Sequence, residues 1–240
     1  MSPFFILPPG TTVGAVVAKK TTSTVPVVFV IGADPIKSGL VAQLNRPGAN
    51  LTGVTSFTNQ MESKRLGLLH ELVPNVELIG VLLNANNPFF DSQMKDLNEA
   101  SRALGVKVNI ERPSTEAEIA KAFKAFAQYR AGAVLVGADP YFNSRRSLVI
   151  DPVTQLRIPA INEWREFAEA GGLMSYGTSL TDSFRQSAGF VAHILKDENP
   201  ADLPVVQSTK FEFIINLKTA KQLDIVVPPG LSARADDILK

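Results

Sequence analysis

Continuous apolar runs that end in Gly and Pro organise this chain. Val27 to Ile31 runs into Gly32-Ala33-Asp34-Pro35, and Ala133 to Val136 runs into Gly137-Ala138-Asp139-Pro140. Such a run, ended by Gly and Pro, is typical of a strand buried on both faces of a parallel sheet. Asp followed by Pro favours the start of a helix, because Asp caps free N–H groups and Pro suits the first helical position. The repeat therefore predicts two strand-to-helix corners of the same design.

A third corner and a regular alternation of patterns follow. Leu78 to Leu83 is apolar and precedes Asn87-Pro88, which predicts a helix that Asn87 caps. Further strands are predicted at 4–7, 51–54, 106–110, 159–161, 172–176 and 211–215. Helices are predicted at about 11–20, 35–44, 62–73 and 87–104, after Thr115, across Phe184–Leu195 and from Asn216. Strands that alternate with helices predict a mainly parallel sheet with right-handed crossovers.

Local signals indicate where several of these elements begin or end. Thr115 with Glu118 matches a capping box, and Gly105 suits the end of the preceding helix. Asp151-Pro152 interrupts the pattern after the second corner, so we expect either a broken helix or one that starts at Asp151. After Pro228-Pro229-Gly230 we expect only a short tail.

The composition excludes several classes of function. Of 240 residues, 45% are hydrophobic and 20% charged, which is ordinary for a folded protein of one large or two small domains. The net charge of +1 gives no reason to expect nucleic acid or a membrane surface as partner. The chain has no Cys, which excludes disulfides and thiolate chemistry. No apolar run approaches the ~20 residues that span a bilayer, and no recognisable signal peptide opens the sequence.

Candidate functional residues gather where strands end, because open α/β sheets bind ligands at the carboxyl ends of their strands. Small residues at a helix start let an anion, such as a carboxylate, approach backbone N–H groups. The candidates are Gly32, Ala33, Asp34, Asn84, Asn86, Asn87, Gly137, Asp139, Tyr141, Trp164, Ser175, Tyr176 and Thr178. Other interpretations stay open. Both Asp residues could serve only as helix caps, Trp164 could cover a surface rather than stack on a ligand, and 175–178 could be a connecting loop.

Few residues suit an enzyme. The sequence has no phosphate-binding glycine motif and no Gly-x-Ser-x-Gly, and its two His residues lie inside predicted helices. We therefore expect no catalytic residue, no cofactor and no metal. A small enzyme that uses Asp34 or Asp139 as a general base remains an alternative.

The order of segments resembles the substrate-binding proteins of ABC importers, in particular the subgroup described as tryptophan- or sugar-binding-like. The resemblance covers nearly the whole chain from Thr11. The matching segments are 26–35, 45–54, Lys64-Arg65-Leu66, Leu72-Val73-Pro74, 84–88, Trp164-Arg165-Glu166-Phe167, 171–177 and 211–220.

This resemblance implies an α/β fold of the periplasmic-binding-protein type, with two lobes of parallel sheets flanked by helices. The first lobe would comprise 1–54 and 178–212, the second 55–177, and the lobe of the strand and helix in 213–240 is left open. The resemblance further implies that hinge closure on a small molecule, such as an amino acid or related carboxylated solute, precedes delivery to a membrane permease. Localisation would then be periplasmic.

Two departures from the family pattern qualify this interpretation. About two strand–helix units that usually precede Phe4 are missing, so the first lobe is expected to be incomplete, with an open edge at which chains could self-associate. The second departure is the Asp151-Pro152 interruption. A shortened inactive relative, or a cytoplasmic ligand-sensing module of a transcription regulator, therefore remains an alternative, although no basic arm or helix-turn-helix precedes Val27.

Overall fold

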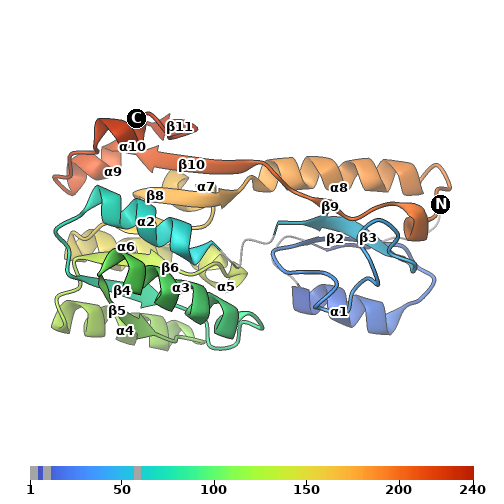
Figure 1. Cartoon of the computed structure of the whole chain (residues 1–240), viewed down its shortest axis with the longest axis horizontal. Coiled ribbons are helices and arrows are strands. Elements are labelled where there is room, and N and C mark those ends of the chain that lie inside the picture. Colours follow the sequence, from blue (N-terminus) through green and yellow to red (C-terminus); the bar gives the residue numbers. More distant parts are fainter. Residues whose placement is uncertain (1–4, 8–11, 57–60) are drawn as a thin grey trace. The chain divides into compact units, whose positions relative to one another are not determined.

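The computed structural model describes residues 5–7, 12–56 and 61–240. The chain divides into two compact units. Unit 1 comprises residues 1–58 and 178–210, and unit 2 comprises residues 59–177 and 211–240, so the chain passes between them three times. Each unit contains a sheet of mainly parallel strands with helices on its faces (Figure 1).

Unit 1 is built on a four-stranded sheet in the order β1-β2-β3-β9, with all neighbours parallel. The strands are β1 (Phe5–Leu7), β2 (Val27–Ile31), β3 (Leu51–Thr55) and β9 (Val206–Gln207), and the helices are α1 (Thr12–Thr21), α8 (Leu180–Ile194) and the short η2 (Pro200–Asp202). All five residues of β2 and of β3 are buried, because α1 and α8 cover opposite faces of this sheet (Figure 1). The apolar run from Val27 to Ile31 thus forms a strand that is buried on both faces, as its continuous apolar pattern predicts.

Gly53 allows β3 to approach β2 closely. Its φ of +155° is one that side chains rarely adopt, and a Cβ there would lie 2.0 Å from the backbone oxygen of Phe29. The glycine is therefore required by the pairing of the two central strands.

Unit 2 is built on a seven-stranded sheet in the order β11-β10-β8-β7-β6-β4-β5. Its strands are β4 (Leu78–Leu82), β5 (Lys107–Glu111), β6 (Ala133–Val136), β7 (Ala160–Asn162), β8 (Met174–Thr178), β10 (Phe211–Asn216) and β11 (Asp237–Leu239). Its helices are α2 (Glu62–Leu72), α3 (Phe90–Leu104), α4 (Glu116–Gln128), α5 (Pro140–Ser144), α6 (Ser147–Leu156), α7 (Arg165–Glu169), α9 (Leu217–Gln222) and α10 (Pro229–Ser232). The neighbours from β5 to β8 pair in parallel, as do β10 and β11.

Two apolar cores lie on opposite faces of the seven-stranded sheet. Ala133 and Leu135 of β6 pack in the core that α2, α3, α9 and α10 cover, whereas Val134 and Val136 pack in the core that α4, α5, α6 and α7 cover. Successive residues of a strand point to opposite faces, so a strand covered on both sides must be apolar throughout. The run from Ala133 to Val136 therefore forms an internal strand of a sheet that helices cover on both faces.

Most predicted elements are confirmed within one or two residues. The capping box is present, with the Thr115 hydroxyl accepting the Glu118 N–H and the Glu118 carboxylate accepting the Thr115 N–H. Gly105 ends α3 in the left-handed conformation, with a φ of +70°. Asn216 caps α9 by accepting the Thr219 N–H at 3.0 Å. Local capping chemistry thus sets these boundaries, as the sequence predicts.

The helix predicted over 35–44 is wrong. Asp34 caps a single turn, in which Leu40 donates to the Pro35 carbonyl, and Gly39 then adopts a φ of +67° that ends the turn. Residues 41–50 continue as bends and irregular chain, although Leu40 and Val41 are buried. The apolar residues therefore fill the core of unit 1 without forming a helix.

Three other boundaries differ from the prediction. The third corner does not open a helix at Pro88, because Asn87 accepts the Phe89 N–H in a separate turn and α3 begins at Phe90. The Asp151-Pro152 pair does not break a helix: α6 runs through Pro152, and the interruption lies between α5 and α6 instead. The expected C-terminal tail is ordered as α10 and β11, and β11 pairs with β10 at the edge of the sheet.

The apolar stripe that predicts α8 lies mainly outside the core. Phe184 and Leu195 are 44% and 46% exposed, and Ser183 and Ser187 are the residues of α8 that are buried. Small serines let the helix lie close to β2 and β3.

No helix among the described residues is long and apolar enough to cross a membrane.

Candidate functional site

The order of strands in unit 2 defines one place where a ligand is expected. After β4 the chain forms β5 on one side of β4 and then β6 on the other, so the sheet order reverses between β4 and β6. In open α/β sheets such a reversal leaves a crevice outside the carboxyl ends of the two strands. The second and third corners, which follow β6 and β4, both lie there.

Asp139 joins these two corners. Its Oδ2 accepts hydrogen bonds from the side-chain amides of Asn84 at 3.0 Å and Asn87 at 2.8 Å, and its Oδ1 accepts the Tyr141 N–H at 2.7 Å. The Asn84 side chain also accepts the Asn86 N–H at 3.0 Å. Four of the predicted site residues, Asn84, Asn87, Asp139 and Tyr141, therefore form one cluster with Asn86 at its rim. Gly137 precedes Asp139 by two residues, and Asp139 also caps α5.

Burial raises the pKa of Asp139 above its usual range, although the three hydrogen bonds that it accepts oppose the shift. A carboxylate offers about four lone-pair positions, and the three donors leave about one unused. The site therefore presents a desolvated carboxylate, which favours a positively charged group or a further hydrogen-bond donor.

Tyr141 lies beside this carboxylate at the start of α5. Its ring contacts the edge of Phe142, and the Arg145 guanidinium lies 4.3 Å from its centroid. Its hydroxyl is buried without a hydrogen-bond partner among the described residues, and burial raises its pKa. Tyr141 thus adds aromatic surface and an unused polar atom to the cluster.

Gly137 is explained by packing rather than by ligand approach. A Cβ at this position would lie 2.4 Å from Cδ2 of Leu83 and 3.0 Å from the carbonyl of Leu82. Its N–H donates to that same carbonyl at 2.8 Å, so β4 and not a ligand occupies the space that the missing side chain leaves.

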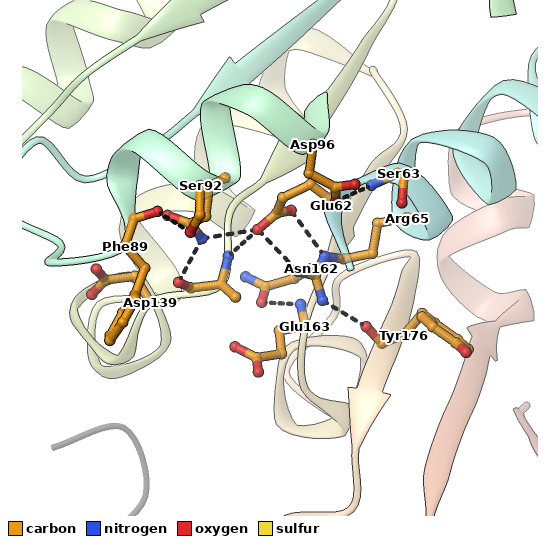
Figure 2. Close-up of polar contacts among 12 residues, drawn as sticks. Glu62, Ser63, Arg65, Phe89, Ser92, Asp96, Asp139, Asn162, Glu163 and Tyr176 are labelled. Carbon is orange, nitrogen blue, oxygen red and sulfur yellow. Dashed lines mark hydrogen bonds and ion pairs between the residues drawn. The ribbon is translucent and has the colours of Figure 1, made fainter. Parts of the chain in front are cut away.

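A buried ion pair is bonded to the backbone of the corner that follows β6. Arg65 donates to both carboxylate oxygens of Glu62, at 3.0 and 3.1 Å, and both side chains are fully buried (Figure 2). Glu62 Oε1 also accepts the Ala138 N–H at 3.0 Å, and the Gln93 amide donates to Glu62 at 2.9 Å and to the Ala138 carbonyl at 3.0 Å. Side chains thereby hold both the N–H and the carbonyl of Ala138, the residue before Asp139.

The pKa of Arg65 follows from this arrangement. Burial disfavours its charged form, but the carboxylates of Glu62 and Glu163 outweigh burial and raise the pKa above its ordinary value. The guanidinium stays charged inside the protein, and it donates through Nη1 to the Tyr176 carbonyl in β8 at 3.0 Å.

The sequence analysis did not select Glu62, Arg65 or Gln93 as site residues. A signal was present, because Glu62 and Arg65 continue the buried helical stripe of Leu69 and Leu72. Opposite charges three residues apart on an apolar face indicate a buried pair.

Trp164, Ser175 and Tyr176 lie near the carboxyl ends of β7 and β8. Trp164 and Ser175 are buried, and neither the Trp164 ring N–H nor the Ser175 hydroxyl has a hydrogen-bond partner among the described residues. Tyr176 is half-buried and stacks on Phe211 with ring centroids 6.2 Å apart, and burial raises its pKa. Trp164 therefore follows the strand next to β6, and Ser175 and Tyr176 lie one strand further along the sheet.

Gly32, Ala33, Asp34 and Thr178 belong to unit 1. Asp34 is half-buried and caps the turn after β2, where it accepts the N–H groups of Ile36 and Lys37 at 2.9 and 3.1 Å. Ala33 and Thr178 are buried. Unit 1 thus keeps the corner design, without the amide donors that surround Asp139.

The described residues contain no group of three or more His, Cys, Asp or Glu side chains that could hold a metal ion.

A reversal of strand order beside a buried polar cluster is typical of an α/β protein that binds a ligand. Residues 3–239 match the family model described as ABC transporter substrate binding protein. The chain belongs to this family, whose members bind solutes rather than act as enzymes and are typically extracellular or periplasmic.

Three relatives show the range of similarity. The tyrosine-binding protein of Clostridioides difficile is 25% identical over 214 residues, which are 89% of this chain and 61% of that protein. The structure of a conserved domain protein from Vibrio cholerae O1 biovar El Tor has a TM-score of 0.85 at 27% identity, over 99% of this chain and 79% of that one. An ABC domain from Streptococcus pneumoniae in complex with L-Trp has a TM-score of 0.84 at 25% identity, over 98% of this chain and 78% of that one.

The chain spans only 61% of the length of the curated relative. The similarity nevertheless confirms the predicted family and the predicted fold of parallel sheets flanked by helices.

Proposed function

We propose that the chain is the solute-binding component of an ABC importer and that it binds a small amino acid-like solute. The observation that carries this proposal is the Asp139 cluster at the reversal of strand order in unit 2. The relatives support it, because one is named for binding tyrosine and another is seen with L-Trp.

The chemistry of the cluster suits a zwitterion with an aromatic side chain. The desolvated Asp139 carboxylate favours an ammonium group, and the Tyr141 ring offers a flat apolar surface. Asn84, Asn87 and the Trp164 N–H, which has no hydrogen-bond partner in the part of the chain that the structure describes, add polar groups that are able to orient a ligand. We therefore rank aromatic amino acids ahead of sugars as ligands.

A thermal melt with a panel of compounds tests the ligand class. L-tryptophan and L-tyrosine are compared with tryptamine, which lacks the carboxylate, with indole-3-propionate, which lacks the ammonium group, and with glucose. Ligand at about a hundredfold over its Kd adds ~2.7 kcal/mol, or roughly 5–10 °C in Tm for a chain of this length. We expect both amino acids to raise Tm, tryptamine to retain part of the effect, and indole-3-propionate to have none.

The Asp139→Asn variant tests whether the solute binds at the Asp139 cluster. It keeps the size of the side chain but removes the charge that the ammonium group needs, so the Tm shift with L-tryptophan should largely disappear. Thr115→Ala, which removes a cap on α4, is the control and should keep the shift. A panel in which only glucose raises Tm would contradict the proposed ligand class.

Further steps of transport stay predictions. They comprise a periplasmic location, hinge closure on the solute, delivery to a membrane permease, and self-association through an edge of the four-stranded sheet. Transport of labelled amino acid by vesicles that contain the permease tests delivery. Sedimentation velocity over a range of protein concentrations tests self-association.

A further inference from the structure

Residues at all three passages of the chain into or out of unit 2 converge on Tyr176. Tyr176 lies two residues before the chain leaves the unit, and Phe211 is the first residue after it returns. Arg65 follows the first passage, in the opening turn of α2. Three segments that are far apart in sequence are therefore neighbours at Tyr176, the middle residue of β8.

The contacts at Tyr176 use both its backbone and its ring. Its carbonyl accepts the Arg65 Nη1–H at 3.0 Å, as Figure 2 shows, and its ring stacks on Phe211 with an interplanar angle of 13°. The Lys64 ammonium lies 6.0 Å from the centre of the same ring. Contacts with both α2 and β10 therefore hold this part of β8.

The other end of the same chain of contacts is the Asp139 corner. Arg65 is bound to both oxygens of Glu62, and Glu62 accepts the N–H of Ala138, the residue before Asp139. Gln93 donates to Glu62 and to the Ala138 carbonyl. One buried ion pair thus connects the corner after β6 with Tyr176 in the middle of β8.

Stability alone does not account for such a pair. Burying two charges costs several kcal/mol each before their attraction is counted, and well-packed apolar residues often serve at least as well in a core. What the pair adds is geometry, since the planar guanidinium fixes the carboxylate in two places and still has a donor for Tyr176.

We propose that Arg65 and Glu62 are positioning residues that hold the Asp139 corner in its binding geometry and couple it to β8 at Tyr176. The inference rests on the proposed function for its ligand, and on the hydrogen bonds of unit 2 for its structure. Neither side chain contacts the ligand in this account. They act through Ala138 and Tyr176.

Four proteins test this proposal: wild type, Arg65→Met, Arg65→Lys and Leu97→Ala. Arg65→Met removes the charge and every donor. Arg65→Lys keeps the charge, but an ammonium group lacks the planar fork that serves Glu62 and Tyr176 together. Leu97→Ala removes fully buried apolar surface from α3 without touching the pair, so it destabilises unit 2 by another route.

The first readout is the affinity for L-tryptophan by calorimetric titration. We expect Arg65→Met to weaken binding about tenfold or more and Arg65→Lys to weaken it by a smaller factor. Leu97→Ala should leave the Kd within about twofold, even where its loss of Tm is as large. Equal losses of affinity in Arg65→Met and Leu97→Ala would overturn the proposal.

The second readout needs no ligand. Hydrogen exchange of the Ala138 amide is compared with that of Val81 in the neighbouring strand β4. We expect Arg65→Met and Arg65→Lys to accelerate Ala138 relative to Val81, and Leu97→Ala to accelerate both alike. Unchanged relative exchange in both Arg65 variants would overturn the proposal. If the wild type binds neither L-tryptophan nor L-tyrosine, the proposed ligand class fails, while this exchange ratio still decides the positioning role.

Discussion

Removing the Asp139 side chain should cost more than removing its counterpart in the repeated corner. In Asp139→Ala the helix cap on α5 is lost, at about 1 kcal/mol, and the buried Asn84 amide is left without an acceptor, at about 1–3 kcal/mol. The substitution also removes a carboxylate whose charged form burial disfavours, and this gain offsets part of the cost. We expect a net loss of about 2–3 kcal/mol from unit 2 at neutral pH.

Asp34→Ala is the matched control, because both residues stand in Gly-Ala-Asp-Pro. The carboxylate of Asp34 accepts the N–H groups of Ile36 and Lys37, which are exposed, so water replaces it readily. We expect a loss of about 1 kcal/mol from unit 1.

The pH dependence of the Asp139 effect has a definite sign. Burial raises the folded-state pKa above the ordinary value of 3.8, so the native protein holds a proton at pH values where the unfolded chain has lost it. The stability that this proton linkage contributes is fully present below the unfolded pKa and is lost as pH rises through the folded pKa. The difference between wild type and Asp139→Ala should therefore be larger at about pH 4 than at pH 7.

Native-state hydrogen exchange measures both effects without assuming that the two units unfold together. Amides of β6 report the stability of unit 2, and amides of β2 report that of unit 1. Equal losses in the two variants, or a difference between wild type and Asp139→Ala that grows with pH, would refute the account of a buried and multiply bonded Asp139.

Four further substitutions have effects that local geometry predicts. Gly177→Ala should destabilise unit 2 by about 1–3 kcal/mol in urea unfolding, because the new Cβ would lie 2.3 Å from the backbone carbonyl of Glu163. Gly189→Ala should stabilise α8 by about 0.5–1 kcal/mol, because its new Cβ would have no neighbouring atom within 4 Å. Thr115→Ala should cost about 1 kcal/mol by the same measurement, and a neutral result would contradict the capping box. A hydrogen bond from Arg165 lowers the pKa of Asp237, so the deficit of Arg165→Ala in the urea midpoint should be present at neutral pH and shrink as pH falls below about 4.

The elements that capping chemistry and continuous apolar runs define could be predicted from the sequence. Val134 and Val136 alternate with apolar neighbours, and β6 is buried on both faces as that pattern predicts. The turn after Asp34 shows the limit of this reasoning. Its Asp-Pro pair is the same as that of Asp139, but Gly39 ends the helix after one turn. The helix predicted over 35–44 did not take this glycine into account.

The Asp139 cluster was predictable as a set of corners, but its support was not. Parallel strands place their carboxyl ends together, so Asn84 and Asp139 are expected at one edge once their strands are known to be neighbours. The contacts of Glu62 with Ala138, and of Arg65 with Tyr176, span 76 and 111 residues of sequence. No local pattern fixes pairings at such distances, because they depend on how helices pack on the finished sheet.

Calorimetric titration of the purified chain with L-tryptophan and L-tyrosine tests the central claim most directly. If the solute binds at the Asp139 cluster, we expect stoichiometric binding of at least one of the two amino acids. The affinity should be severely weakened in Asp139→Asn and unchanged in Thr115→Ala. Saturable binding that Asp139→Asn leaves intact would place the solute elsewhere than at the Asp139 cluster and would contradict the account.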